Sequence, residues 1–297
     1  MIVSFKGSFL GLIAWQWRNA LLFVSTAVAA QLLHEHLGMV HLKLPPLPLT
    51  VAGAALGIFV SFRTNACYAR WWEGRQLWGR LINSSRHLAS QALLNLDPDT
   101  ARAVVRRQIA YAHLLRCGLR DQDPFADADV RAYLTEDEQA RWRGDSNPCF
   151  AALHAHRAAI TARADAGALH EDRLLAMDAT LGSLLDVQGG CERIKKTPFP
   201  RAYNYIAERL ILAFGVMLPF GMVESLGWVA VPMNLLVCGA FAMISEVGRV
   251  LEDPFTLFWN GLPLYALSKT IETNLRHRMG ETDVPPIPRP DAKGVLM

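Results

Sequence analysis

Apolar residues are concentrated in four stretches of the chain, and each stretch predicts a membrane-crossing helix. The stretches cover residues 20–33, 47–62, 210–223 and 227–245. A spanning helix needs roughly 20 predominantly apolar residues, so each stretch must be extended by interfacial residues to cross a bilayer. Buried core helices of a soluble protein can have the same length, and hydropathy alone leaves that alternative open.

The charges that flank the stretches favour the membrane interpretation. Basic residues precede the first and third stretches and follow the second and fourth, so they all lie on one side if the chain crosses four times. The turns on the other side, residues 34–46 and 224–226, contain only Lys43 as a formal cation. The positive-inside rule therefore predicts that both termini and the long middle segment are cytoplasmic. Residues 1–33 lack a clear signal-peptide cleavage site, so the first stretch is interpreted as a retained helix.

The middle of the chain is hydrophilic but has a helical pattern throughout. Leu174, Met177 and Leu181 recur at spacings of three and four residues. Thr135 followed by Glu138 predicts a capping box at the start of a helix. Residues 121–129 and 144–148 are predicted to be loops.

These patterns predict an all-α membrane protein and divide the chain into successive parts. The predicted parts are a cytoplasmic segment (1–19), a first transmembrane helix pair (20–62), a cytoplasmic helical domain (63–202), a second transmembrane pair (203–248), a C-terminal helical segment (249–280) and a proline-rich tail expected to be disordered (281–297).

Composition narrows the class further. Hydrophobic residues make up 52% of the 297 residues and charged residues 19%, which exceeds the balance of an ordinary soluble protein. A net charge of +3 is too small to indicate nucleic-acid binding. The five cysteines are widely spaced and form no Cys-x-x-Cys pair, which favours free thiols in a reducing compartment.

The sequence lacks the common catalytic motifs. It contains no Gly-x-x-x-x-Gly-Lys loop, no Gly-x-Ser-x-Gly elbow and no His-Glu-x-x-His pair. His34 and His36 would point to different faces of a helix, and the same holds for His154 and His156. We therefore expect no catalytic residue, no cofactor and no metal site.

Two basic and aromatic segments are unusual. Residues 62–86 place five arginines and three tryptophans directly after an apolar stretch, where arginines must find carbonyls or carboxylates and aromatic rings sit at the interface. Residues 189–205 return a basic, proline-marked turn to the third stretch.

These segments resemble the bestrophin family of membrane channels, in particular its bacterial branch. The resemblance covers residues 10–278 approximately. Its motifs are Phe62-Arg63-Thr64-Asn65, Arg70-Trp71-Trp72-Glu73-Gly74-Arg75, Trp78-Gly79, Cys191-Glu192-Arg193-Ile194, Thr197-Pro198 and Glu252-Asp253-Pro254-Phe255.

The resemblance implies a homopentamer around one central pore, with four transmembrane helices per subunit and a helical cytoplasmic domain. It implies passive ion flux across the bacterial inner membrane. Small monovalent cations such as sodium are expected, because the bacterial relatives favour them. The expected partners are four further copies of the chain, the permeating ions and the lipid bilayer, with no nucleic acid. A chloride or anion channel of the same fold is the alternative.

Ala54, Ile58 and Phe62 are the candidate pore neck. Their i, i+4, i+8 spacing places them in one stripe along a helix, and the resemblance implies that this stripe faces the pore axis. A narrow apolar passage gates ions by dewetting, because it cannot replace their hydration shell. Packing against neighbouring helices is the plain alternative. Gly53 and Gly57 predict close helix contact on an adjoining face.

Calcium gating is not expected. In the calcium-activated relatives an acidic run follows the Pro-Phe of the fourth stretch, whereas this chain has Thr256-Leu257-Phe258-Trp259-Asn260-Gly261. Glu252 and Asp253 are instead predicted to cap a helix that opens at Pro254. A secondary transporter and a membrane-anchored scaffold or sensor with a protein-binding cytoplasmic domain are the alternatives of other classes. The spans lack the ionisable residues that mark coupling sites in transporters.

Overall fold

The structure is a computed structural model that describes residues 15–37, 44–258, 260–291 and 294–296. Its described part is helical without strands. The helices are α2 (Trp17–Leu37), α3 (Pro46–Asn95), α4 (Pro98–Leu119), α5 (Ala128–Arg131), α6 (Glu136–Trp142), α7 (Pro148–Asp165), α8 (Glu171–Lys196), α9 (Arg201–Leu226), the 3-10 turn η2 (Gly227–Val229), α10 (Ala230–Leu251) and α11 (Leu264–Arg278).

The described residues form two compact units. Residues 15–71 and 198–252 form one, which we call the apolar unit, and residues 72–197 and 253–296 form the other, the polar unit. Two helical stretches, Pro46–Asn95 and Ala202–Leu251, are long and apolar enough to cross a membrane by length and composition. Both contribute to the apolar unit.

The predicted domain boundaries lie inside helices. The boundary at 62/63 falls within α3, which continues without interruption to Asn95. The boundary at 202/203 falls within α9. The predicted N-terminal segment lies largely outside the described residues, as do residues 38–43 of the 34–46 turn. The proline-rich tail has no helix where it is described, and its Pro285 carbonyl accepts a hydrogen bond from the Thr273 hydroxyl at 2.9 Å.

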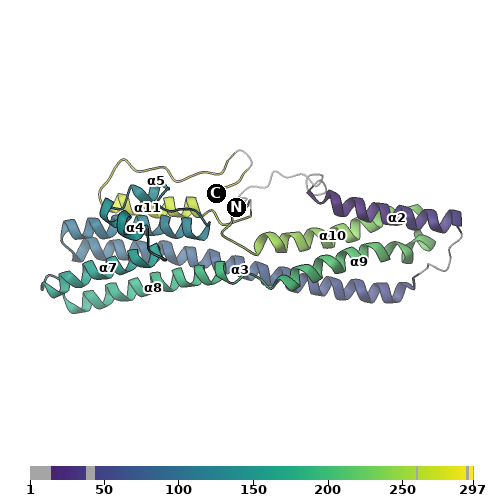
Figure 1. Ribbon diagram of the computed structural model, residues 1–297, viewed down its shortest axis with the longest axis horizontal. Coiled ribbons are helices and arrows are strands. Elements are labelled where there is room, and N and C mark those ends of the chain that lie inside the picture. Colours follow the sequence, from purple (N-terminus) through teal and green to yellow (C-terminus); the bar gives the residue numbers. More distant parts are fainter. Residues whose placement is uncertain (1–14, 38–43, 259, 292–293, 297) are drawn as a thin grey trace. The chain divides into compact units, whose positions relative to one another are not determined.

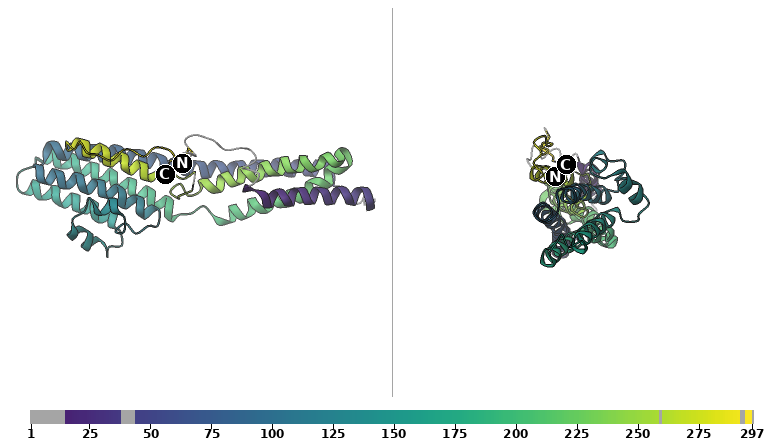
Figure 2. Two further views of the ribbon diagram at one scale, coloured as in Figure 1. Left: turned by 90° about the horizontal axis from the view of Figure 1, so that it is seen from above. Right: turned by 90° about the vertical axis from the view of Figure 1, so that its left-hand side faces the viewer.

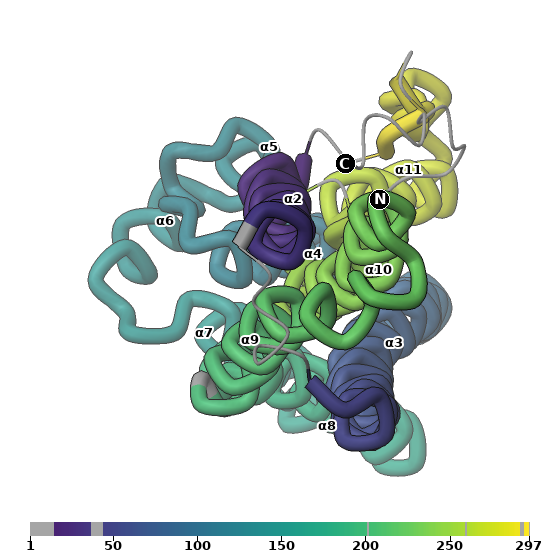
Figure 3. Tube along the Cα trace, turned by 90° about the vertical axis from the view of Figure 1, so that its right-hand side faces the viewer, coloured from purple at the N-terminus to yellow at the C-terminus, as the bar shows by residue number. Residues whose placement is uncertain are grey.

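In the apolar unit, α2, α9 and α10 pack against one another, and Figure 3 shows the three helices end-on. Their shared core joins α3 through Leu56 and Val60, which pack with Phe23, Ile211 and Phe214. Burial of these side chains is the main source of stability in a helix whose other face is exposed.

A buried polar contact crosses this core where α9 contains a proline. Pro219 has no N–H, so the carbonyl of Gly215 four residues earlier lacks its helical donor. The side-chain amide of Asn234 donates to that carbonyl at 3.1 Å and to the Phe23 carbonyl at 2.8 Å. Asn234 is fully buried, so both bonds replace hydration that the site excludes.

The polar unit is a bundle in which α4, α7 and α8 run along one another (Figures 1 and 2), with α11 packed on α4. The predicted capping box is confirmed, because Thr135 and Glu138 exchange side-chain to backbone hydrogen bonds at the start of α6. The predicted loops at 121–129 and 144–148 match the chain between α4 and α5 and between α6 and α7, except that α5 begins at Ala128 and α7 begins at Pro148.

A buried charged cluster joins α4 and α11. The Glu272 carboxylate contacts His113 Nε2 at 3.1 Å and accepts bonds from Lys269 Nζ at 2.8 Å and the Tyr133 hydroxyl at 2.7 Å. Lys269 also binds Asp129 at 2.8 Å. Burial alone would raise the pKa of Glu272, but these donors outweigh it and lower the pKa to about 2.

Candidate functional site

The three predicted neck residues lie on an exposed face of α3. Ile58 is 59% exposed and Phe62 is 72% exposed, and Ala54 is exposed as well. Leu56 and Val60, on the opposite face, are buried in the core of the apolar unit. Among the described residues, the stripe therefore does not pack on other helices of its own chain, and packing against helices of a second chain stays the alternative. A second chain or an aqueous passage can still cover it.

The adjoining face of α3 makes close contacts, as its glycines predict. A Cβ atom at Gly53 would lie 2.9 Å from the Phe214 ring, and one at Gly57 would lie 3.5 Å from the Phe241 ring. Both rings belong to the α9–α10 pair, so the prediction of close helix contact at Gly53 and Gly57 is confirmed.

Arg63 fixes the rotation of α3 immediately after Phe62. Its side chain is 2% exposed; Nε donates to Asn204 Oδ1 at 2.8 Å, and Nη1 donates to both oxygens of Ser245 at 2.9 and 2.8 Å. The next residue, Thr64, donates to the Ile244 carbonyl at 3.3 Å. Because these bonds hold one side of α3 against α9 and α10, Ile58 and Phe62 must project to the other side.

The arginine-rich motif is satisfied as its chemistry requires. Arg70 Nε donates to the Glu252 carbonyl at 2.7 Å, and Asn204 donates to the Glu252 carboxylate at 2.6 Å. The tryptophans differ in exposure, although all three were predicted to lie at the membrane interface. Trp72 is 47% exposed, but Trp78 is fully buried in the core of the polar unit, so its assignment to the interface was wrong. Helical periodicity indicated that burial, since Trp78 shares its spacing with Leu81.

The exposed face continues along α3 beyond the predicted neck. Its positions, three or four residues apart, are Leu47, Val51, Ala54, Ile58, Phe62, Asn65, Ala69, Trp72, Gln76, Arg80, Asn83, His87, Ser90 and Leu94. We call this set the outward face of α3. The outward face is apolar as far as Phe62 and contains both polar and apolar residues beyond it. All of α3 is described, and Arg80 is the only residue of this face with a permanent charge. Sequence reasoning stopped at Phe62, although the same spacing continues without glycine or proline on this face.

In the polar unit, ion pairs connect residues 193–195 with the motif of residues 70–75 and with the motif of residues 252–255. Arg193 pairs with Glu73, and Lys195 pairs with Asp253 at 3.1 Å and with Asp121 at 2.9 Å. Burial alone would lower the pKa of Lys195, but the two carboxylates outweigh it and raise the pKa. A Cβ atom at Gly74 would lie 3.1 Å from Pro254, so the motif of residues 70–75 is also in direct contact with the motif of residues 252–255.

The helix predicted to open at Pro254 is absent. Residues 253–258 form turns, and the next helix, α11, begins at Leu264. Asp253 Oδ1 accepts from the Phe255 backbone N–H at 3.0 Å, which closes a turn of the kind that aspartate favours. Glu252 is the C-cap of α10 rather than an N-cap. Asp-Pro is compatible with both a helix start and a turn, and here the turn forms.

Within the described residues, no group of histidine, cysteine and acidic side chains is arranged to hold a metal ion. His156 is fully buried, and neither ring nitrogen has a hydrogen-bond partner. Burial lowers its pKa well below the ordinary value, helped by the nearby Arg107 charge. A neutral imidazole in the core accounts for this residue.

Among the described residues, two helical stretches of the apolar unit are long and apolar enough to cross a membrane, which fits an α-helical membrane protein. Residues 1–277 match the family model of the bacterial and fungal bestrophin proteins. The chain therefore belongs to the bacterial and fungal bestrophin family.

Similar proteins agree with this assignment. A voltage-dependent anion channel-forming protein of Ralstonia nicotianae is 35% identical over 95% of this chain and 92% of its own. The voltage-dependent anion channel-forming protein YneE of Escherichia coli K12 is 35% identical over 87% of this chain and 84% of its own. The crystal structure of a bestrophin homologue from Klebsiella pneumoniae superposes with a TM-score of 0.83 at 33% identity, covering 89% of this chain and 98% of that chain.

Proposed function

We propose that this chain forms an ion channel in which several copies surround one pore lined by the outward face of α3. The observation that carries the proposal is the exposure of Ala54, Ile58 and Phe62 while the opposite side of α3 in the apolar unit packs on and is bonded to α9 and α10. A homopentamer follows from the family resemblance. The assembly would cross the bacterial inner membrane with four helices per subunit and with both termini in the cytoplasm.

Ala54, Ile58 and Phe62 would form the neck of that pore. All three are apolar, and a narrow ring of such side chains cannot replace the water that an ion loses on entry. Ions would then pass only when water fills the neck. The small side chain of Ala54 would make the outermost ring wider than the other two.

We further propose that the permeating ions are anions rather than the small monovalent cations expected from the sequence. The names of the Ralstonia and Escherichia relatives refer to anion channels, which favours this alternative. The outward face supports it physically, because Arg80 contributes a positive charge and no position of the face carries a carboxylate. Rings of basic side chains attract anions into a pore.

Reversal potentials of the full-length protein in planar bilayers test the sign of the permeating charge. In an asymmetric sodium chloride gradient, we expect a value near the chloride equilibrium potential. A value near the sodium equilibrium potential would restore the cation interpretation and contradict the anion proposal. Matched recordings of Arg80→Gln should move the potential toward zero, whereas Arg102→Gln, an exposed arginine on α4, should leave it unchanged.

Passive flux into proteoliposomes tests the class of protein. A channel takes up ions without any counter-substrate, and a secondary transporter requires one. A scaffold or sensor gives no flux above protein-free vesicles, and that result would overturn the channel proposal.

A further inference from the structure

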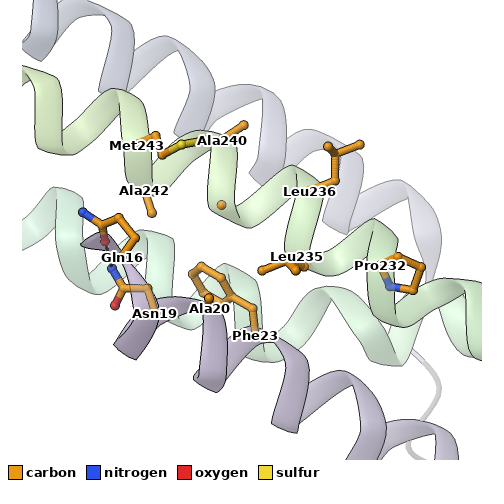
Figure 4. Close-up of a pocket in the computed structure, with 11 residues that line it drawn as sticks. Gln16, Asn19, Ala20, Phe23, Pro232, Leu235, Leu236, Ala240, Ala242 and Met243 are labelled. Atoms are coloured by element: carbon orange, nitrogen blue, oxygen red, sulfur yellow. Dashed lines mark hydrogen bonds between the residues drawn. The ribbon is translucent and has the colours of Figure 1, made fainter. Parts of the chain in front are cut away.

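The apolar unit contains a cavity of about 350 Å³ between α2 and α10. Polar side chains line one end of the cavity, and apolar side chains line the rest. Figure 4 shows the side chains of Gln16 and Asn19 at one end and those of Pro232 and Leu236 at the other. Phe23 and Leu235 line the middle. The interior therefore suits a hydrocarbon, with hydrogen-bonding groups at one end only.

A second cavity of about 230 Å³ meets the polar end of the first. The two share Gln16, Asn19 and Ala242 as lining residues. The second cavity adds the carboxylates of Glu208 and Glu246 and the hydroxyl of Ser245. The two cavities therefore adjoin, and we call the first the apolar arm and the second the acidic head.

The acidic head has an excess of negative charge. Arg249 Nε donates to Glu246 at 2.8 Å, so this carboxylate is paired. Glu208 is exposed and makes no direct hydrogen bond among the described residues; the Arg249 charge also acts on it, so two carboxylates share one guanidinium. Asn19 donates to Gln16 Oε1 at 2.6 Å, which leaves Asn19 Oδ1 as a further acceptor. An ammonium group is the complement of this arrangement, because it supplies three donors and one positive charge.

The length of the apolar arm matches one leaflet of a bilayer. From Ala242 to Pro232 the α10 helix rises about 15 Å, at 1.5 Å per residue. Half of a hydrocarbon core of about 30 Å is the same length. The acidic head lies near the start of α2 and α9 and the end of α10, which in the proposed four-helix topology would be the level of the headgroups.

We propose that this site binds an aminophospholipid of the surrounding bilayer. One acyl chain would occupy the apolar arm, and the primary ammonium of an ethanolamine headgroup would bind Glu208. The choline headgroup has a quaternary ammonium without N–H donors, so it can use the charge but not the hydrogen bonds. The proposal depends on the chain being a membrane protein and is independent of what the pore conducts.

Native mass spectrometry of the full-length protein in mild detergent tests the headgroup. The probe is an equimolar mixture of phosphatidylethanolamine and phosphatidylcholine with identical acyl chains. We expect wild type to retain the ethanolamine lipid over the choline lipid by about two- to fivefold, the range of an ion pair at an exposed site. Glu208→Gln should bring the ratio close to one, and Glu171→Gln, an exposed glutamate on α8, should leave it at the wild-type value.

A second pair of variants tests the apolar arm. Gly239 lines the cavity, and a Cβ atom there meets nothing within 4 Å, so Gly239→Leu fills the arm without a clash at the backbone. We expect Gly239→Leu to lower retention of both lipids at least twofold. Gly182→Leu, at an equally open helical glycine on α8, should leave retention unchanged.

Three results would overturn the proposal. One is equal retention of both lipids by wild type, and another is an unchanged ratio in Glu208→Gln. The third is that Gly239→Leu dissociates the oligomer but still retains lipid. This result would indicate that a second copy of the chain, and not a lipid, covers the apolar arm. If Gly239→Leu does not fold, Glu208→Gln still decides the outcome, since its exposed side chain changes by one atom.

Discussion

Asn234 on α10 donates the hydrogen bond that Pro219 removes from α9. The acceptor is the Gly215 carbonyl, at 3.1 Å from the Asn234 amide nitrogen. The same nitrogen reaches the Phe23 carbonyl on α2, so one buried side chain joins three helices.

Replacement of Asn234 by leucine should destabilise the apolar unit. The variant keeps side-chain size but leaves the Gly215 carbonyl with only a long bond of 3.4 Å from the Thr26 hydroxyl, so a cost of about 1 kcal/mol is expected. Thermal unfolding in detergent, followed by loss of the oligomer peak in size-exclusion chromatography, measures the change. Asn83→Leu on the exposed face of α3 is the control, and an equal melting temperature for both variants would contradict the role of Asn234.

Truncation of the neck should increase ion flux without unfolding the protein. Ile58 and Phe62 are exposed in the single chain, so their replacement by alanine together leaves no cavity within it. Leu56→Ala, on the buried face of the same turns, should cost about 2 to 5 kcal/mol. Flux assays in proteoliposomes, with the oligomer verified by light scattering, compare the variants. Unchanged flux through an intact oligomer would exclude Ile58 and Phe62 as the gate.

Enlargement of Ala54 should have the opposite effect. Ala54→Ile adds a third bulky apolar ring to the proposed neck, so the passage should wet less often and the current should fall. Single-channel recordings compare its open probability with that of wild type. An increase in current would place Ala54 away from the pore.

Two serine-to-cysteine substitutions test the membrane topology. Ser225 lies in the short turn predicted to be periplasmic, and Ser90 lies in the part of α3 predicted to be cytoplasmic; both are exposed. An impermeant maleimide should label Ser225→Cys in intact cells and Ser90→Cys only after lysis. The five native cysteines are buried, so wild type supplies a low background. The reverse labelling pattern would invert the proposed orientation.

Calcium should not change the open probability. Asp253, the acidic residue nearest the segment that binds calcium in the regulated relatives, is already paired with Lys195. Micromolar calcium is added to the cytoplasmic face of a bilayer and then removed by a chelator, with magnesium as the control. A reversible rise specific to calcium would refute this expectation.

The Glu272 cluster should make the polar unit sensitive to acid. The pKa of Glu272 is lowered from 4.5 to about 2, so its stabilising contribution is complete above about pH 4.5 and is lost as the pH falls toward 2. A shift of this size corresponds to roughly 3 kcal/mol. Denaturant unfolding between pH 7 and pH 2 should show that Glu272→Gln is less stable at pH 7 and that its difference from wild type shrinks in acid. A constant difference would show that Glu272 acts only through packing.

Much of the helical architecture could be predicted from the sequence. Periodicity identified the helices of the polar unit, and the Thr135–Glu138 box marked the start of α6. The resemblance motifs placed arginines where carbonyls accept them, as Arg63 and Arg70 do. The helical periodicity and the capping box depend on residues a few positions apart, which is why local patterns reveal them. The carbonyl partners of Arg63 and Arg70 are each 182 residues away, so the sequence indicated only the kind of acceptor and not its position.

The remaining features depend on contacts between distant residues. Lys195 and Asp253 are 58 residues apart, and Gly215 and Asn234 belong to different helices, so no local pattern predicts either pair. The turn at Pro254 was missed because Asp-Pro fits two local structures; in the observed turn Asp253 pairs with the distant Lys195. The cavities proposed to bind a lipid are lined by residues of three helices, and no local sequence pattern indicates them.

The burial of the cysteines should protect their thiols from oxidation. Burial raises the pKa of Cys117 to about 11 and that of Cys191 to about 12. At pH 7 a thiol with a pKa near 11 is ionised in about one molecule in ten thousand, and oxidants react with the ionised form. Peroxide should therefore leave these sulfurs unmodified, and the protein should migrate as a single chain on a denaturing gel with or without reductant.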